Sequence, residues 1–391
     1  MNRILPDWLD AYLEYTNNTE PRESYRAWAG ASAIAAALQR KCYLQLGMLR
    51  FFPNLYIVLV GPPAARKGTA IETAEALLDM IGIRPAADES SRQKLVSALL
   101  DMGAMHTDNA GMTYIHSSMT IIASELTVFI GYQNIDFLTV LCKWYDCESH
   151  FVYDTYSHEK QEVSNVWVNL LGATTPMLIQ TSLPPGAIGS GFASRTIFVY
   201  EDDMAGVVIE PALSPAQEEI GEALRKDLGQ INTLCGRFNY SRDFIKVYGA
   251  WRIKASKSTT RIDPRLDYYM QRRHVHLLKL CMIYSASTSD DMKIGVQEFE
   301  RARNLLEAAE AKMAYTFQGF GANPLAQQQL QIMRVVAEEK EISIKKLMNM
   351  FYEDVSGKDL SVIITTMERM GFCNFDMMNG VVTYIRKGGM Q

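Results

Sequence analysis

Residues 54–70, "NLYIVLVGPPAARKGTA", join an apolar run to a glycine, a lysine and then a segment with helical spacing. An apolar run of this length predicts a buried β-strand, and the residues after it favour a turn that opens a helix. The loop pattern G-x-x-x-x-G-K-[ST] has this setting, because backbone N–H groups and a helix N-terminus together surround a polyphosphate. Gly61 and Lys67 keep the spacing of that pattern, whereas Arg66 replaces its second glycine.

We therefore expect the loop to bind ATP together with Mg²⁺, with Lys67 reaching the β- and γ-phosphates. Thr69 is the candidate magnesium contact because it follows the lysine closely, and a backbone-only arrangement at Gly68 is the alternative. An ordinary Gly-Pro turn after a core strand is the other interpretation of the stretch. The candidate nucleotide contacts in the loop are Gly61, Pro62, Pro63, Ala64, Ala65, Arg66, Lys67, Gly68 and Thr69.

The composition is that of a folded protein, with 391 residues of which 48% are hydrophobic and 21% charged. This length predicts two or three domains. No run reaches the ~20 apolar residues of a membrane span, and the first residues include acids where a signal peptide needs an apolar core. Six cysteines without metal-binding spacing predict reduced thiols and no zinc. We expect a protein that stays in the cytoplasm, with no membrane partner.

Three further apolar runs follow the loop: "MTIIASEL", "VNLLGATTP" and "SRTIFVYE". Buried strands separated by helices predict an α/β fold with a parallel or mostly parallel sheet. Ligands in such sheets bind at the carboxyl ends of the strands. The expected domains are an N-terminal helical segment over 1–50, the α/β core over 51–205, a helical lid over 206–320 and a small C-terminal domain over 321–391.

Polar residues follow the predicted strands in an order that suits phosphoryl transfer. Glu125 ends the second strand and is the candidate acid that orients or deprotonates the attacking water, with a helix-capping glutamate as the alternative. Ser124 stands where an Asp would hold magnesium through water. Thr174 or Thr175 ends a strand expected between the other two, where a hydroxyl would contact the γ-phosphate or the water.

Two arginine positions are candidates for stabilising the transition state. Arg195 follows a glycine-rich loop and directly precedes a strand, so it could project into the nucleotide of a neighbouring subunit. A surface salt bridge is the alternative role. Arg272 and Arg273 lie on a later predicted helix, and Arg273 is the preferred lid contact to the γ-phosphate.

Residues 151–171, "FVYDTYSHEKQEVSNVWVNLL", alternate on both sides of "SHEKQ" and predict a β-hairpin inserted into the sheet. His158 and Lys160 at its tip are the candidate nucleic-acid contacts, because hairpins in single-strand channels hold the backbone through lysine and aromatic side chains. Aromatic residues on a hairpin also pack into cores, which is the alternative.

Charge is unevenly placed in a chain whose formal net charge is −5. Residues 241–280 hold ten Lys/Arg against three Asp, and a segment of this kind can face phosphate or be a solvated helical face. Residues 321–391 read as three helices and a hairpin turning at Asn379-Gly380, the pattern of a winged helix. Its eight basic residues balance its eight acidic ones, so this domain faces DNA or a protein.

The segments "PNLYIVLVGPPAARKGTA", "IIASEL", "VNLLGATTP" and "GFASRTIFVY" resemble, block by block, a family of helicase-like P-loop ATPases of bacteriophages and integrated elements. The resemblance covers roughly residues 5–315 and extends to AAA+ hexameric helicases of the minichromosome-maintenance and viral superfamily-three kinds. It implies a ring ATPase with nucleotide between subunits. It also implies roles for four residues: Lys67 as the loop lysine, Glu125 as the catalytic acid, Thr174 as the sensor and Arg195 as the finger acting in trans.

The expected fold is therefore an AAA+-like P-loop NTPase core with an inserted β-hairpin, a helical lid and a winged helix. The expected function is that of an ATP-dependent DNA helicase or translocase in phage or mobile-element replication. We expect a homo-oligomer, with a hexamer as the preferred assembly, that acts on single-stranded or forked DNA together with other replication proteins. The alternatives are an ATP-switched helicase loader with slow hydrolysis, and a structural α/β protein with a decayed loop. The sequence departs from the ATPase pattern at Arg66, Gly68 and Ser124, and these departures affect how magnesium would be coordinated.

Overall fold

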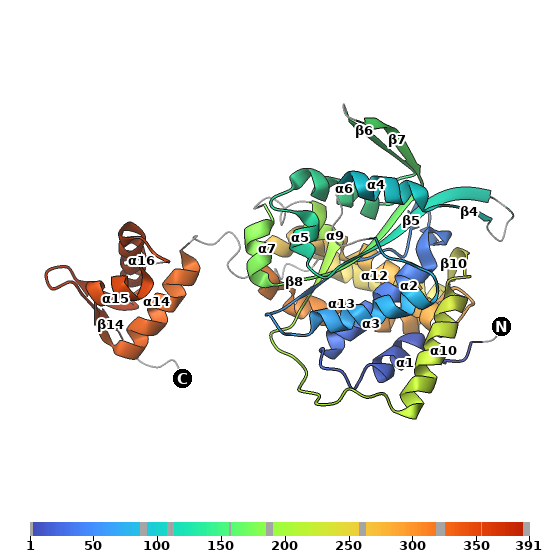
Figure 1. Ribbon diagram of the computed structural model, residues 1–391. Coiled ribbons are helices and arrows are strands. Elements are labelled where there is room, and N and C mark those ends of the chain that lie inside the picture. Colours follow the sequence, from blue (N-terminus) through green and yellow to red (C-terminus); the bar gives the residue numbers. More distant parts are fainter. Residues whose placement is uncertain are drawn as a thin grey trace. The chain divides into compact units, whose positions relative to one another are not determined.

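The structure is a computed structural model, and its chain forms two compact units, Met1–Gln318 and Gly319–Gln391 (Figure 1). The segment "GFGANP", residues 319–324, has the composition of a linker and lies outside the described residues. The residues that the structure describes are 3–86, 92–107, 111, 113–155, 158–184, 191–257, 263–317, 325–352 and 354–385.

A five-stranded sheet forms the centre of the first unit, in the order β4-β5-β8-β3-β9. Neighbours pair in parallel except β4, which runs antiparallel to β5. The predicted mostly parallel α/β sheet is therefore confirmed, and β8 lies between β3 and β5 as expected. The strands are β3 (Tyr56–Val60), β4 (Gly103–Thr107), β5 (Thr113–Ala123), β8 (Val166–Thr174) and β9 (Thr196–Tyr200).

Helices cover both faces of this sheet, which explains why its central strands are buried and mostly apolar. Every residue of β3 and β8 is buried. On β8, Asn169 donates to the backbone oxygen of Ser32 in α2, whereas Gly172 lies against Leu126 of α5. Residues three apart on a strand point to opposite faces, so α2 and α5 lie on opposite sides of the sheet. These helices are α2 (Glu23–Leu38) and α5 (Leu126–Ile130).

A second sheet of four short strands joins parts of the chain that were expected to lie in separate domains. Its order is β11-β10-β1-β2, and β1 pairs in parallel with β10 through Cys42 opposite Gly236. The expected boundaries near residues 50 and 206 therefore separate strands that pair with each other. The strands are β1 (Cys42–Leu46), β2 (Leu49–Phe51), β10 (Gly236–Tyr240) and β11 (Lys293–Ile294).

Helices make up most of the rest of the first unit, as the sequence predicts for its two ends. They are α1 (Trp8–Tyr15), α3 (Lys67–Met80), α4 (Arg92–Asp101), α6 (Ile135–Tyr145), α7 (Pro176–Ser182), α9 (Gly191–Arg195), α10 (Pro215–Ile231), α11 (Arg242–Lys257), α12 (Asp267–Thr288) and α13 (Val296–Met313). Short 3-10 turns cover Gln39–Lys41, Pro264–Leu266 and Ala314–Phe317. The described part of the chain has no helix with the length and apolar character that a membrane crossing needs.

The predicted hairpin is present, between α6 and β8, as the antiparallel strands β6 (His150–Thr155) and β7 (His158–Ser164). It projects beyond the main sheet in Figure 1. Phe151 and Val163 at its base are buried, and Phe151 packs edge-on against Trp144. The base of the hairpin is thus fixed to the core, while residues 156–157 of its turn lie outside the described residues.

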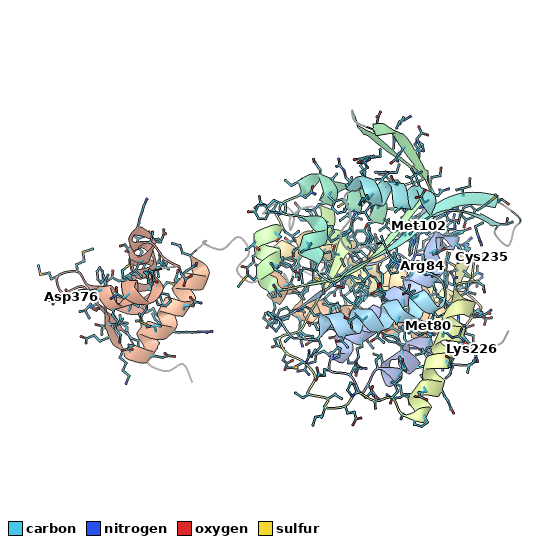
Figure 2. The ribbon with its side chains drawn as sticks, in the orientation of Figure 1. Met80, Arg84, Met102, Lys226, Cys235 and Asp376 are labelled. Carbon is cyan, nitrogen blue, oxygen red and sulfur yellow. The ribbon has the colours of Figure 1, made fainter. Side chains whose placement is uncertain are left out.

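The second unit contains the three helices and the hairpin that its sequence predicts. Its helices are α14 (Ala326–Glu339), α15 (Ile344–Phe351) and α16 (Gly357–Arg369), and its sheet has the order β12-β14-β13, with β12 (Glu341–Ser343), β13 (Cys373–Asp376) and β14 (Val381–Tyr384). Asp376, labelled in Figure 2, accepts hydrogen bonds from the backbone N–H groups of Met378 and Asn379. Gly380 then adopts a φ of 62°, so the predicted turn is confirmed.

Candidate functional site

The loop between β3 and α3 follows the carboxyl end of β3, and α3 begins at Lys67. Arg66 occupies the position before the helix with φ 58° and ψ 28°, a left-handed conformation that glycine adopts with little strain. The chain therefore keeps at Arg66 the backbone shape for which the phosphate-loop pattern uses its second glycine. The side chain of Arg66 is directed away to an ion pair with Glu20.

Gly61 is required by its surroundings. A Cβ at this position would lie 2.4 Å from the hydroxyl of Tyr25 and 2.6 Å from the backbone oxygen of Glu201. Tyr25 is held there because its hydroxyl donates to the backbone oxygen of Val60, 2.7 Å away. The first residue of the loop thus lies against buried groups of α2 and of the segment after β9, which fixes where the loop begins.

Lys67 is half-buried and bends back over its own loop. Its Nζ donates to the backbone oxygens of Gly61 and Pro62, at 2.9 and 2.8 Å. Burial lowers the pKa of Lys67, and the nearby negative charge of Glu125 partly offsets this effect. The lysine and the predicted catalytic acid therefore interact electrostatically across the carboxyl edge of the sheet.

Glu125 follows β5 and occupies the N-cap position of α5, but its side chain makes no capping hydrogen bond. Its carboxylate instead accepts a hydrogen bond of 2.9 Å from the hydroxyl of Thr127. The acid is therefore oriented by a neighbouring side chain rather than used to stabilise the helix end. Ser124 before it is exposed, so the hydroxyl that replaces an Asp here is open to solvent.

Thr174 ends β8, between the strands that carry the loop and the acid. Its side chain is fully buried, and its hydroxyl has no hydrogen-bond partner among the residues that the structure describes. Its backbone oxygen accepts from the N–H of Gly61, which ties it to the first residue of the loop. Thr175 has a different role, because its hydroxyl caps α7 by accepting from the N–H of Leu178. Of the two predicted threonines, Thr174 is the one with an unused hydroxyl at this edge.

Arg195 lies at the opposite edge of the sheet from the loop, because β9 begins directly after it and runs parallel to β3. Its Nε donates to Asp146 at 3.1 Å, and Arg272 donates to the same carboxylate at 2.8 Å. Burial opposes ionisation of Asp146, but the two guanidinium groups hold its pKa below the usual value. The predicted salt-bridge alternative for Arg195 is thus present, and the residue is not brought to its own chain's loop.

Arg273, the preferred lid contact, is engaged elsewhere in the described part of the chain. Its guanidinium forms ion pairs with Glu310 and Glu307 of α13 and lies 4.9 Å from the ring centroid of Trp251. Burial raises the pKa of Glu310 to about 7, although Arg273 opposes this shift. Its described contacts are with α11 and α13, and none of them joins Arg273 to the loop.

The two candidate nucleic-acid contacts lie on β7, the second strand of the hairpin. His158 begins this strand and pairs with Thr155, the last residue of β6, so it lies at the end of the described strand pairing, and Lys160 lies two residues further along β7. Lys160 is exposed and forms an ion pair with Glu162 two residues along the same strand. The side chain of His158 lies outside the described residues.

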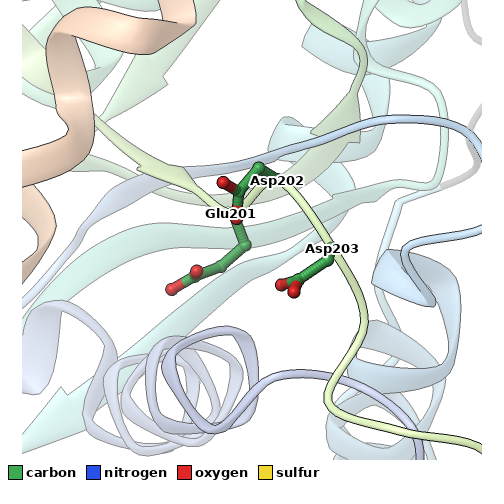
Figure 3. A group of neighbouring side chains, drawn as sticks. All are labelled: Glu201, Asp202 and Asp203. Carbon is green, nitrogen blue, oxygen red and sulfur yellow. The ribbon is translucent and has the colours of Figure 1, made fainter.

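An acidic cluster follows β9 next to the loop, at Glu201, Asp202 and Asp203 (Figure 3). One ligand atom from each lies within 4.8 Å of the others. Glu201 is already bound by the hydroxyl of Ser24 and the amine of Lys312, and Asp203 pairs with Arg22. Two of the three carboxylates thus already have cationic partners, so the cluster by itself does not define a metal centre.

Sequence reasoning missed Tyr25 and Asp146, which fix Gly61 and Arg195 respectively. Neither belongs to a motif, and both lie far along the chain from the residues that they hold. The arrangement at the carboxyl edge fits a polyphosphate, because it combines a helix N-terminus, a lysine, an acid and an unused buried hydroxyl. No protein-family model matches the chain, and a search of curated proteins found no match either.

Proposed function

We propose that the chain is an ATP-dependent DNA helicase or translocase of phage or mobile-element replication, with an AAA+-like P-loop core in residues 51–205. The observation that carries the proposal is the convergence of Lys67, Glu125 and Thr174 at the carboxyl ends of three neighbouring strands, β3, β5 and β8. Phosphoryl transfer needs positioning and charge neutralisation more than covalent chemistry. A cation, an acid and a buried hydroxyl around a helix N-terminus supply those needs.

In this proposal each residue has a distinct task once nucleotide is bound. Lys67 exchanges the backbone oxygens of Gly61 and Pro62 for the β- and γ-phosphates, a favourable exchange because its ammonium gains a charged acceptor. Glu125 orients the attacking water, and the hydroxyl of Thr174 contacts the γ-phosphate or that water. Mg²⁺ neutralises developing phosphate charge when bound, with Thr69 as its candidate protein contact and the nucleotide supplying other oxygens.

The position of Arg195 supports an assembly in which nucleotide lies between copies of the chain. Arg195 precedes β9 at the amino edge of the sheet, whereas the loop follows the carboxyl end of β3. An arginine so placed serves the nucleotide of a neighbouring copy, and a closed ring satisfies every site in the same way. We propose a hexamer in the bacterial host cytoplasm, with the β6–β7 hairpins facing single-stranded or forked DNA and the C-terminal unit, as a winged helix, binding DNA or a replication protein.

A loader that hydrolyses ATP slowly is the second candidate, and the conformation of the loop favours it. Lys67 is bonded to its own loop, Arg66 pairs with Glu20 and Ser124 replaces a metal-orienting acid. Each of these features delays or weakens formation of the hydrolytic geometry without preventing nucleotide from binding. Such a protein would change partners with the nucleotide state rather than move along DNA.

Steady-state ATP hydrolysis with and without single-stranded DNA tests the proposal. The variants are Lys67→Ala, which removes the loop amine, and Glu125→Gln, which keeps the shape of the acid but not its charge. Lys143→Ala, at an exposed lysine of α6, is the matched control. We expect DNA-stimulated turnover in the wild type and the control, and a loss of at least about 100-fold in the other two variants.

Nucleotide binding separates the remaining outcomes. Glu125→Gln should still bind ATP, because the acid acts on the water and not on the phosphates. Tight binding with slow turnover that ignores DNA, together with capture of a replicative helicase, would support the loader. Absence of nucleotide binding in the folded wild type would contradict both candidates and favour a structural role for the loop.

A further inference from the structure

A cavity of about 540 Å³ opens at the amino edge of the main sheet. Asn54, which lines it, comes just before β3, whereas the phosphate loop follows the other end of the same strand. With about 3.3 Å per residue, the five residues of β3 separate the two places by roughly 16 Å. The cavity is therefore distinct from the candidate nucleotide site within one chain.

One face of α12 forms a wall of this cavity. Tyr268, Gln271, Arg272, Val275 and Lys279 all line it, at spacings of three and four residues that place them on one side of a helix. The other walls come from β2 and the segment after it, from the end of α6 with the two residues that follow it, and from Ser194 of α9.

The charged groups of the lining are mostly cationic. Arg50, Arg272 and Lys279 face a single acid, Asp146. Asp146 is shared, because Arg195 and Arg272 both bind its carboxylate. One carboxylate therefore serves two guanidinium groups and leaves Arg50 and Lys279 without an ion-pair partner among the described residues.

Lys279 is the most unusual member of the lining because it is 3% exposed and has no carboxylate partner in the described contacts. Its Nζ donates to the backbone oxygen and side-chain Oδ1 of Asn54, at 2.9 and 2.7 Å. The amine also lies 3.7 Å from the ring centroid of Tyr145. An ammonium has three donors, and Asn54 accepts from two of them. Burial lowers the pKa of Lys279 to about 7, so an anion that approached it would favour its charged form.

We propose that this cavity is a second phosphate-binding site, which takes a phosphoryl group of a nucleotide between Arg272, Lys279 and Arg50. The phosphoryl oxygens replace Asp146 as the acceptor for Arg272, and Asp146 stays paired with Arg195. Phe52 and Tyr268 also line the cavity and add aromatic surface beside the cations, which suits a ligand that carries a base. The proposal does not depend on hydrolysis at the loop. The phosphoryl group comes either from a free nucleotide or from nucleotide held on the loop of a neighbouring copy.

Binding of inorganic phosphate to full-length protein tests the site with the loop disabled. In a Lys67→Ala background, calorimetry should detect phosphate binding that weakens at least about tenfold on adding Arg272→Gln or Lys279→Met, the loss expected for one charge-assisted hydrogen bond. Lys279→Met keeps the volume of the side chain, and Arg272→Gln changes a partly exposed residue, so at least one variant should remain folded. Lys254→Gln, an exposed lysine of α11, is the control and should bind as its parent does.

An experiment that mixes two variants distinguishes the two possible sources of the phosphoryl group. Lys67→Ala protein, with an intact cavity, is mixed with Arg272→Gln/Lys279→Met protein, with an intact loop. Association that needs ATP, and that is lost when both partners carry the cavity changes, assigns the site to a neighbour's nucleotide. Saturable phosphate or ADP binding without association assigns it to a free ligand. Equal phosphate binding by Lys67→Ala and by its cavity variants, without ATP-dependent association, would overturn the proposal.

Discussion

Gly61 decides at the level of one atom whether the loop can form. Because an added Cβ would approach the Tyr25 hydroxyl and the Glu201 backbone oxygen closely, we expect Gly61→Ala to lower the free energy of unfolding by about 1–3 kcal/mol, as overpacking does. Urea denaturation measures this change. Gly206→Ala is the control, since a Cβ there meets nothing within 4 Å and should leave stability nearly unaltered. Equal effects at both glycines would mean that Gly61 is not constrained by these neighbours.

Thr174 offers a test in which stability and activity move in opposite directions. Its buried hydroxyl has no hydrogen-bond partner in the described part of the chain, so Thr174→Val should raise the free energy of unfolding by about 1 kcal/mol or more while lowering ATP turnover at least about tenfold. Thr196→Val is the matched control, because that equally buried hydroxyl donates to Phe192 at 2.9 Å and its removal should destabilise the fold. Unchanged turnover in a stabilised Thr174→Val protein would make the hydroxyl a packing feature only.

Because Lys279 is buried, it should make the free energy of unfolding increase with pH. Its pKa falls from 10.5 to about 7 on folding, so between these values the unfolded chain holds a proton that the folded chain lacks. Stability therefore rises with pH across this window, and the full cost of the buried charge applies below about pH 7. Lys279→Met removes this dependence.

The free energy of unfolding of Lys279→Met minus that of the wild type should fall by a few kcal/mol from about pH 6.5 to pH 10, at about 1.4 kcal/mol per pKa unit. Loss of the hydrogen bonds to Asn54 would shift this stability difference by the same amount at every pH, so it does not alter the dependence on pH. Lys143→Met, at an exposed position on α6, should give a difference that stays level with pH. A level difference for Lys279→Met as well would contradict the lowered pKa.

At the scale of elements, local pattern was a good guide wherever the partner lies close along the chain. The hairpin β6–β7 and the turn at Gly380 were predictable because alternation and turn residues act within ten or so positions. The pairing of β1 with β10 was not, since Cys42 and Gly236 are far apart in sequence and neither strand carries information about its partner. The same holds for Asp146, whose role depends on two arginines from α9 and α12.

The β6–β7 hairpin provides the test of nucleic-acid contact. Lys160 is exposed, so Lys160→Gln should leave stability within about 0.5 kcal/mol while weakening single-stranded DNA binding and reducing the salt dependence by about one phosphate contact. Fluorescence anisotropy at several salt concentrations measures both quantities. Lys143→Gln of α6 is the control. If the two variants bind DNA alike, the hairpin does not contact the phosphate backbone through Lys160.

At the scale of the whole molecule, the first unit presents its loop and its candidate finger at opposite edges of one sheet. β3 and β9 pair in register, with Tyr56 opposite Thr196 and Val60 opposite Tyr200. Arg195 therefore stands beside the start of β3, and Gly61 comes after its end. A rigid sheet keeps them apart, so a single copy does not combine Lys67 and Arg195 around one nucleotide.

Mixing two inactive variants tests whether neighbouring copies combine them. Lys67→Ala lacks a working loop and Arg195→Ala lacks the finger, so each alone should hydrolyse ATP poorly. In a mixed ring, an interface works only when an Arg195→Ala copy supplies the loop and the neighbouring Lys67→Ala copy supplies the finger. If the two variants are present in equal amounts and exchange at random, about a quarter of the interfaces meet this condition. Turnover should therefore recover on mixing, and dilution that separates the copies should abolish it.

Loss of the Arg195 ion pair needs its own control, because Asp146 would then keep only Arg272. Asp146→Asn removes the charge of the partner and keeps the arginine, so it should match Arg195→Ala in any loss of stability but retain turnover. Mixtures of Lys67→Ala with Asp146→Asn should show no more activity than the Asp146→Asn share predicts. If mixing Lys67→Ala with Arg195→Ala also adds nothing while both variants stay folded, Arg195 acts only within its own chain, as the partner of Asp146.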